Sequence, residues 1–148
     1  YGGNQKVSIL QEIDYLKTYI ALRKLRMSER LRLRVEFPPE LNELNIYPLL
    51  FLPLVENAFK YVGGDYQLDI IMKWENNRIS LFIRNSIPEL SAEDEALRKS
   101  VDERQRKGIG LVNLRRRLSL LYPSKHRLET RKEETEFVAE LMIEIEEI

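Results

Sequence analysis

One short stretch of the sequence places a carboxylate, an amide and an ammonium group on the same apolar segment. Glu56, Asn57 and Lys60 fall at positions i, i+1 and i+4 of a predicted helix. The residues between them are apolar: Leu54, Val55, Ala58 and Phe59. Burying polar groups without partners costs about 1–3 kcal/mol each. A magnesium-bound polyphosphate would explain them, because an amide oxygen suits Mg²⁺, an ammonium binds phosphate and a carboxylate orients a water or hydroxyl. A polar stripe on an amphipathic surface helix is the alternative.

A second segment later in the chain is suited to binding an anion. Gly108 and Gly110 precede an apolar stripe at helical spacing, formed by Leu111, Leu114, Leu118 and Leu121. Glycines let the backbone approach a ligand closely, and the first turn of a helix offers unpaired N–H groups to anions. The pattern predicts a helix that begins at Leu111 with a phosphate site at its N-terminus. A glycine pair in an ordinary tight loop is the alternative.

Helical spacing predicts two further helices. The first is capped by Ser8 and continues to about Met27, with apolar residues recurring every three or four positions. The second covers residues 47–62 and carries the three polar residues described above. Pro53 marks either its effective start or a bend, and Gly63-Gly64 ends it.

Alternation of apolar and polar residues predicts strands over residues 31–37, 68–74, 79–83, 126–132 and 137–145. Residues 86–107 have no such periodicity and are rich in charge, which is typical of a functional loop, with room for a short helix over 92–101. The assembled pattern predicts an α+β two-layer sandwich, in which helices cover one face of a mixed, mostly antiparallel sheet.

The composition limits the class of protein. A chain of 148 residues is one domain by length, and Lys+Arg and Asp+Glu balance at 24 each. No global field therefore attracts nucleic acid, and Arg115-Arg116-Arg117 is predicted to be a solvated helix edge. The absence of cysteine excludes disulfides and thiolate metal sites. No apolar run approaches the roughly 20 residues of a membrane helix.

The two polar motifs resemble those of the histidine-kinase ATPase superfamily, which also includes DNA gyrase and MutL. Val55 to Tyr61 is similar to its N box, and Lys107 to Leu118 looks like its glycine box in the version found in LytS-type sensor kinases. The resemblance spans nearly the whole chain and implies the Bergerat ATP-binding fold. It implies a linking helix over residues 1–30, an ATPase domain over 31–148 and an ATP lid over 86–107.

The resemblance also implies a function. The chain resembles the ATP-binding catalytic domain of a two-component sensor kinase, which donates the γ-phosphoryl group of ATP to a histidine outside this sequence. Glu56 is implied to orient or accept a proton at the reacting phosphate, and Asn57 to hold Mg²⁺. The other implied nucleotide contacts are Lys60 and Tyr61, the amide of Asn85, and the backbone of Gly108, Gly110 and Leu111.

One departure from the superfamily concerns the base. An aspartate that binds the adenine amino group is expected at a strand end where this sequence reads Arg84-Asn85-Ser86. Arg84 is read as occupying the aspartate position, and arginine cannot accept a hydrogen bond. Asn85 is then the available acceptor. The alternative function is a degenerate ATPase-like signalling module with weak or no nucleotide binding, which acts through protein contacts.

The second departure is the missing phosphoacceptor. His126 is the only histidine, and its place at the start of a predicted strand indicates a structural residue. The chain is therefore expected to be a C-terminal portion of a longer protein, a cytoplasmic domain of an inner-membrane sensor. The expected partners are a phosphoacceptor helix and a response regulator, within a homodimer of the full-length protein. A nucleic-acid partner is not expected.

Overall fold

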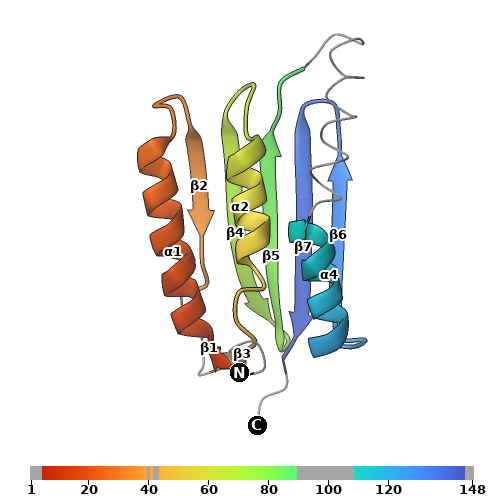
Figure 1. Ribbon diagram of the computed structural model, residues 1–148. Helices are drawn as coiled ribbons and strands as arrows, with labels where there is room; N and C mark the ends of the chain where they lie inside the picture. Colours follow the sequence, from red (N-terminus) through yellow and green to blue (C-terminus); the bar gives the residue numbers. More distant parts are fainter. Residues whose placement is uncertain (1–4, 40, 42–43, 90–108, 146–148) are drawn as a thin grey trace.

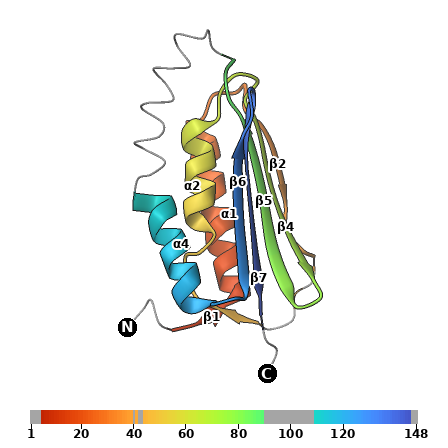
Figure 2. The ribbon, with the colours of Figure 1, turned by 90° about the vertical axis from the view of Figure 1, so that its right-hand side faces the viewer.

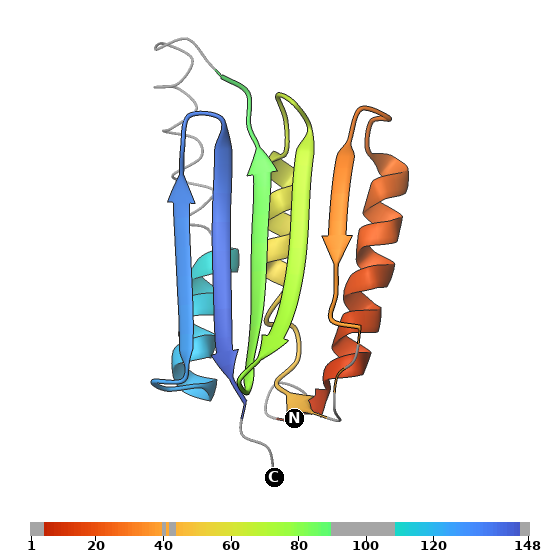
Figure 3. The ribbon, with the colours of Figure 1, turned by 180° about the vertical axis from the view of Figure 1, so that it is seen from behind.

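The computed structural model describes residues 5–39, 41, 44–89 and 109–145. Its helices form one layer against a mixed sheet, which confirms the predicted fold class (Figure 1). The described helices are α1 (Ile9–Arg26), α2 (Leu52–Tyr61) and α4 (Ile109–Leu121). Figure 2 shows these helices on the same side of the sheet, and Figure 3 shows the opposite face bare of described helices.

The main sheet has the strand order β2-β4-β5-β7-β6. Its strands are β2 (Arg32–Glu36), β4 (Gln67–Glu75), β5 (Arg78–Ser86), β6 (His126–Lys132) and β7 (Glu136–Glu144). β2 runs parallel to β4, and the other neighbouring strands are antiparallel. Asn76 and Asn77 have φ angles of 53° and 61°, the left-handed conformation that a tight hairpin turn between β4 and β5 requires.

A second, two-stranded sheet was not predicted. β1 (Val7–Ser8) pairs antiparallel with β3 (Asn45–Ile46), and the backbone N–H of Ile9 donates to the Leu44 carbonyl at 2.9 Å. Strands of two residues are too short to show alternation, so the sequence pattern contains no signal for them. The pairing ties the start of α1 to the chain that leads into α2.

The helix boundaries follow their local chemistry. The Ser8 side chain caps α1 as predicted, accepting the backbone N–H of Leu10 at 3.2 Å. α2 is shorter than the predicted 47–62 and begins at Leu52, with Pro53 in its first turn. Proline lacks an N–H and its ring clashes with a preceding helical turn, so the helix starts here rather than bending.

One apolar core lies between the helices and the sheet. The core face of α1 is formed by Ile9, Ile13, Leu16 and Ile20, all buried. These residues belong to the same cluster as the buried residues of α2 and the central strands. α1 is therefore an integral part of this core, and a linking role for residues 1–30 stays a prediction.

A buried carboxylate and an arginine hold the segment that precedes α2. Glu12 of α1 is 6% exposed, and its Oε1 accepts the backbone N–H of Leu49 at 3.1 Å. Arg117 of α4 donates to the carbonyls of Pro48 at 2.9 Å and Leu49 at 3.3 Å. Leu49 has a left-handed φ of 61°, which is uncommon for leucine. The helices on either side of α2 thus fix the turn from which it starts.

The basic cluster of α4 has a structural function in two of its members. Arg117 braces the turn before α2, and Arg115 donates to the carbonyl of Leu128 in β6 at 3.1 Å. Arg115 and Arg116 are exposed, as the predicted solvated edge requires, whereas Arg117 is half-buried. The guanidinium groups of Arg115 and Arg117 tie α4 to β6 and to the turn before α2.

Burial of Glu12 gives the stability of the fold a pH dependence. Burial raises the pKa of this carboxyl, against the opposing effects of the Leu49 hydrogen bond and the Arg117 charge. A pKa raised on folding means that stability is greatest below the unfolded-state pKa of about 4.3 and falls as pH rises through the folded-state pKa. Glu12→Gln keeps an acceptor for Leu49 but has no charge to desolvate. Between about pH 4 and neutrality, the wild-type free energy of unfolding should therefore fall relative to that of the variant.

Urea unfolding of both proteins at a series of pH values measures this difference. Asp14→Asn is the matched control, because Asp14 is an exposed carboxylate on the same helix. A stability difference between wild type and Glu12→Gln that stays constant with pH would contradict the prediction.

Candidate functional site

The polar residues predicted on α2 occupy its outer surface. Glu56 and Lys60 are exposed, whereas Asn57 and Tyr61 are half-buried. The spacing of four residues puts Glu56 and Lys60 on one stripe, and Asn57 and Tyr61 on a second. The Lys60 Nζ lies 5.4 Å from the centre of the Tyr61 ring, so the two stripes touch at the C-terminal end of the helix. The apolar face beneath them is buried, as predicted.

The two stripes face different neighbours. Tyr19 of α1 packs edge-on against Phe59 of α2 at 6.2 Å, and the Arg23 guanidinium lies 5.6 Å from the centre of the same ring. Burial raises the pKa of the Tyr19 hydroxyl, the Arg23 charge lowers it, and the nearby Glu56 carboxylate raises it further. Glu56 is therefore on the side of α2 that faces α1. The next residue is turned by about 100° around the helix, which carries Asn57 towards the side where α4 lies (Figure 1).

The register of β5 changes the interpretation of Arg84. Successive strand residues point to opposite faces, and Ile83 of β5 belongs to the core beneath the helices. Arg84 therefore points to the open face, where its Nε donates to Oδ2 of Asp69 at 3.0 Å. The 2% exposed Asp69 carboxylate also accepts the Gln67 Nε2 at 2.8 Å. Contrary to the motif alignment, Arg84 is outside the helix-facing position in which an adenine-binding residue is expected.

Asn85 occupies that helix-facing position. Its side chain is 0% exposed, and its Oδ1 is buried with no hydrogen-bond partner among the described residues. Within the described ranges, its Nδ2 makes one long hydrogen bond, of 3.4 Å, to the Ser86 carbonyl. An unpaired buried oxygen costs about 1–3 kcal/mol, and such groups are rare enough in native proteins to require an explanation. A hydrogen-bond donor on a ligand would satisfy this oxygen.

Backbone and side-chain bonds hold the end of α2 over the end of β5. The Gly63 N–H donates to the Ser86 carbonyl at 2.9 Å, and the Ser86 hydroxyl donates to the Gly63 carbonyl at 2.7 Å. The same hydroxyl accepts the Gln67 N–H at 2.8 Å. Ser86 thus fixes the helix that bears Asn57 relative to the strand that bears Asn85.

Gly64 lies at this junction, and we expect its substitution to have a large effect on stability. Its φ is +61°, and a Cβ there would lie 2.8 Å from the Ile87 carbonyl oxygen. The left-handed conformation costs an L-residue about 1–2 kcal/mol, and this overlap is with backbone that cannot rotate away. Gly64→Ala should lower the free energy of unfolding by about 2–3 kcal/mol, measured by urea denaturation. Asp65→Ala, at an exposed neighbour, is the control; an equal effect of both substitutions would contradict the prediction.

α4 begins two residues earlier than predicted. It starts at Ile109 rather than Leu111, so Gly110 lies within its first turn. Leu111 is half-buried against the core, and Leu114 and Leu118 are buried, as the apolar stripe predicted. Gly108 and the lid prediction from residue 90 onward, including the short helix over 92–101, lie outside the described residues.

The donor set limits the kind of metal site that this chain offers. Within the described ranges, no group of three or more histidine, aspartate or glutamate side chains is placed to hold a metal ion. Mg²⁺ does not need such a cage, because it is usually held by one or two protein oxygens together with substrate phosphates and water. The amide oxygen of Asn57 fits that requirement. His126 is engaged elsewhere, with its Nδ1 2.8 Å from the Tyr122 carbonyl oxygen.

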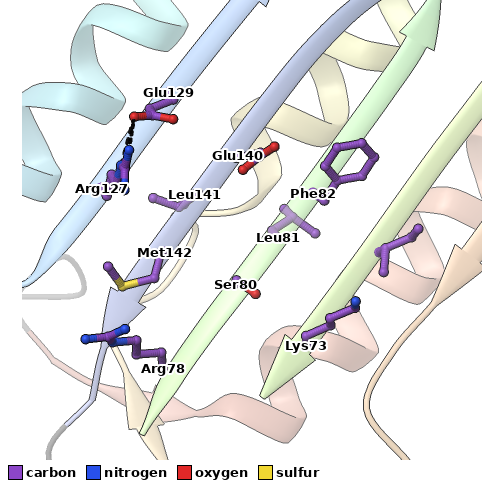
Figure 4. Close-up of a pocket in the computed structure, with 11 residues that line it drawn as sticks. Lys73, Arg78, Ser80, Leu81, Phe82, Arg127, Glu129, Glu140, Leu141 and Met142 are labelled. Atoms are coloured by element: carbon purple, nitrogen blue, oxygen red, sulfur yellow. Dashed lines mark hydrogen bonds and ion pairs between the residues drawn. The ribbon is translucent and has the colours of Figure 1, made fainter. Parts of the chain in front are cut away.

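A hollow of about 480 Å³ lies on the other face of the sheet (Figure 4). Its floor includes Ile71, Phe82 and Met142, and charged side chains such as Lys73 and the ion-paired Arg127 surround it. The hollow is separated by the whole thickness of the sheet from the helix-side residues described above. It is therefore not the predicted nucleotide site.

Comparison with curated proteins identifies a kinase homologue. No protein-family model matches the chain. The sensor protein kinase HptS of Staphylococcus aureus is 28% identical over 131 residues, which cover 85% of this chain and 25% of HptS. The chain thus spans about a quarter of the length of the curated relatives that it matches. In the described part of the chain, no helix is long and apolar enough to span a membrane.

Solved structures with the same fold are catalytic domains of histidine kinases. The catalytic domain of histidine kinase ThkA superposes with a TM-score of 0.62 at 15% identity, covering 95% of both chains. The mycobacterial sensor histidine kinase MprB gives 0.60 at 13% identity, over 97% of this chain and 99% of that one. Full-length ShkA in complex with AMPPNP gives 0.63 at 15% identity, over 95% and 31%. The chain is therefore a homologue of a sensor protein kinase, with the fold of histidine kinase catalytic domains.

Proposed function

We propose that this chain is the ATP-binding catalytic domain of a two-component sensor histidine kinase. The observation that carries the proposal is the buried, unpaired Oδ1 of Asn85, which lies on the helix side of a histidine-kinase fold. It supports a site that is completed by a ligand bearing an N–H donor. Homology to a sensor protein kinase and the likeness to ShkA, solved with AMPPNP, make an adenine nucleotide the ligand to test.

In this proposal Asn85 recognises the base. Its Oδ1 accepts a hydrogen bond from the exocyclic amino group of adenine, the group that a carboxylate binds in the resembled superfamily. Hydrogen bonds to a charged partner are roughly twice as strong as neutral ones. We therefore expect weaker nucleotide binding than a carboxylate would give. The half-buried Tyr61, on the same stripe as Asn57, lines the sugar or base side.

The phosphate end is assigned to α2 and to the start of α4. Asn57 would hold Mg²⁺ through its amide oxygen, and Lys60 would contact a phosphate oxygen. The backbone N–H groups of Gly108, Gly110 and Leu111, with the positive end of the helix dipole, would bind the polyphosphate. Bound Mg²⁺ supplies neutralisation of the charge on the phosphate oxygens.

We assign Glu56 a role toward the histidine that accepts the phosphoryl group. Its exposed carboxylate, on the α1 side of α2, would orient the incoming histidine or accept its proton. Phosphoryl transfer depends mainly on positioning and charge neutralisation, so this set of residues suffices for one substrate. The acceptor histidine belongs to another part of the parent protein or to its dimer mate, and a response regulator receives the phosphoryl group next. Membrane anchoring of the parent is part of the same proposal.

The alternative function is a degenerate signalling module with weak or no nucleotide binding, and its main argument was the reading of Arg84 as the base-binding residue. This residue pairs with Asp69 on the open face and does not fill the helix-side position. Calorimetric titration with AMPPNP, with and without Mg²⁺, separates the two functions. We expect saturable binding that Mg²⁺ strengthens. No binding at millimolar nucleotide would favour the non-catalytic module.

A further inference from the structure

α1 carries a second apolar stripe, on the side opposite to its core face. Tyr15, Leu22 and Leu25 are 51%, 59% and 82% exposed. Together with Thr18 they follow a spacing of three, four and three residues, the spacing with which one helix packs along another. Single exposed apolar residues need no explanation, but a row on one helix face at this spacing is typical of a contact surface.

A shallow groove lies between α1 and the edge strand β2. Its volume is about 440 Å³, and its apolar lining includes Ala21 and Phe37. Lys17 and Lys24 also line the groove, with the Lys17 Nζ 5.5 Å from the centre of the Phe37 ring. Lys17 and Lys24 therefore flank the apolar stripe on the side of α1 that faces β2.

The charge of this surface is one-sided, although the whole chain is neutral. The exposed charged residues of α1 are three basic ones and Asp14; the basic ones are Lys17, Lys24 and Arg26. The other carboxylate of α1, Glu12, is buried against Leu49. A second copy of the chain would bring like charges together. A single helix stripe also falls short of the roughly 800 Å² per partner that stable dimers bury.

We propose that this surface docks an amphipathic helix whose apolar residues follow the same three–four spacing and are flanked by aspartate or glutamate. Its apolar side chains pack between Tyr15, Leu22 and Leu25, and its carboxylates face the cations on both flanks of α1. Such acidic flanks fix the orientation of the bound helix and speed its association. The proposal does not depend on nucleotide binding.

Two synthetic helical peptides test the proposal by fluorescence anisotropy. Both carry leucine at the three–four positions, and they differ only in flanking glutamate or flanking lysine. The glutamate peptide should bind at least about tenfold more tightly than the lysine peptide, and salt should weaken its binding. The double variant Leu22→Ser/Leu25→Ser should lose at least about tenfold in affinity. Leu120→Ser, on α4 and 75% exposed, is the matched control and should bind as wild type does.

Other outcomes would overturn the proposal in distinguishable ways. Sedimentation that shows self-association, abolished by Leu22→Ser/Leu25→Ser, would assign the surface to a second copy. Binding to vesicles of anionic phospholipid without binding to the glutamate peptide would assign it to a membrane. Absence of saturable peptide binding, or an equal loss in Leu120→Ser, would leave the surface without a helical partner. Nucleotide titration of the double variant is unchanged in each case, so the proposed function is judged separately.

Discussion

Asn57→Ala should remove the magnesium dependence of nucleotide binding and weaken AMPPNP binding in the presence of Mg²⁺ by at least about tenfold. The reason is the position of the residue: Asn57 is half-buried on the outer surface of α2, on the side that turns towards α4. Its amide oxygen is the metal donor proposed on this helix, and alanine has none. Without Mg²⁺, the two proteins should bind the nucleotide equally, because the metal contact is then absent from both.

The substitution separates binding from folding. Alanine is the best helix former, so α2 keeps its propensity, and the apolar face beneath Asn57 is unchanged. Calorimetric titration with and without Mg²⁺ gives the result, and urea unfolding checks that stability is retained. Asn45→Ala is the matched control, because Asn45 is an exposed amide in the small β1-β3 sheet. An unchanged magnesium dependence in Asn57→Ala would remove Asn57 from the metal site.

The strands of the main sheet were predicted well because the alternation of residues along a strand is a local signal in the sequence. Leu68, Ile70 and Met72 recur at every second position, and all three are buried in β4, as a strand with one buried face requires. The position of the strands, the hairpin turn and the layer of helices followed from such patterns. The start of α2 was predicted less well, because Pro53 permitted either a bend or a helix start and local sequence does not choose between them.

Long-range contacts left no local signal. Glu12 looked like one polar residue among others on α1, and its hydrogen-bond partner, Leu49, is 37 residues away. Arg117 reaches Pro48 across 69 residues. Each was invisible to periodicity, although both decide where α2 begins. The β1 and β3 strands are two residues long and show no period at all.

The assignment of Arg84 conflicts with the register of β5 for a different reason, since the information that indicates the register was present in the sequence. Motif spacing put Arg84 in the aspartate position, whereas the parity of the strand put Asn85 there. Leu81 and Ile83 face the core, so the residue two positions further on faces it as well. A motif alignment can be displaced by one residue without an evident conflict. In a β-strand the same displacement moves every side chain to the opposite face of the sheet.

Substitutions at Arg84 and Asn85 test which of the two residues lies in the base-binding position: Arg84, as motif spacing indicates, or Asn85, as the register of β5 indicates. Asn85→Leu should weaken AMPPNP binding by at least about tenfold, because it removes the acceptor that the base would use. Asn85→Asp should instead strengthen AMPPNP binding by roughly tenfold, since a carboxylate accepts the adenine amino group with charge assistance. A guanine analogue presents a carbonyl oxygen at that point and should gain nothing from Asn85→Asp.

Arg84→Gln is the control for the Asn85 substitutions. Under the motif alignment it would install an acceptor in the adenine position and strengthen AMPPNP binding. On the structure, its side chain faces away from the helices, so nucleotide affinity should stay at the wild-type value. Its effect should fall on stability, because it removes the cation that pairs with the buried Asp69. Calorimetry with both nucleotide analogues, together with urea unfolding, measures the two effects separately. A gain in affinity in Arg84→Gln with none in Asn85→Asp would restore the motif alignment and reject the register of β5 as a guide to this site.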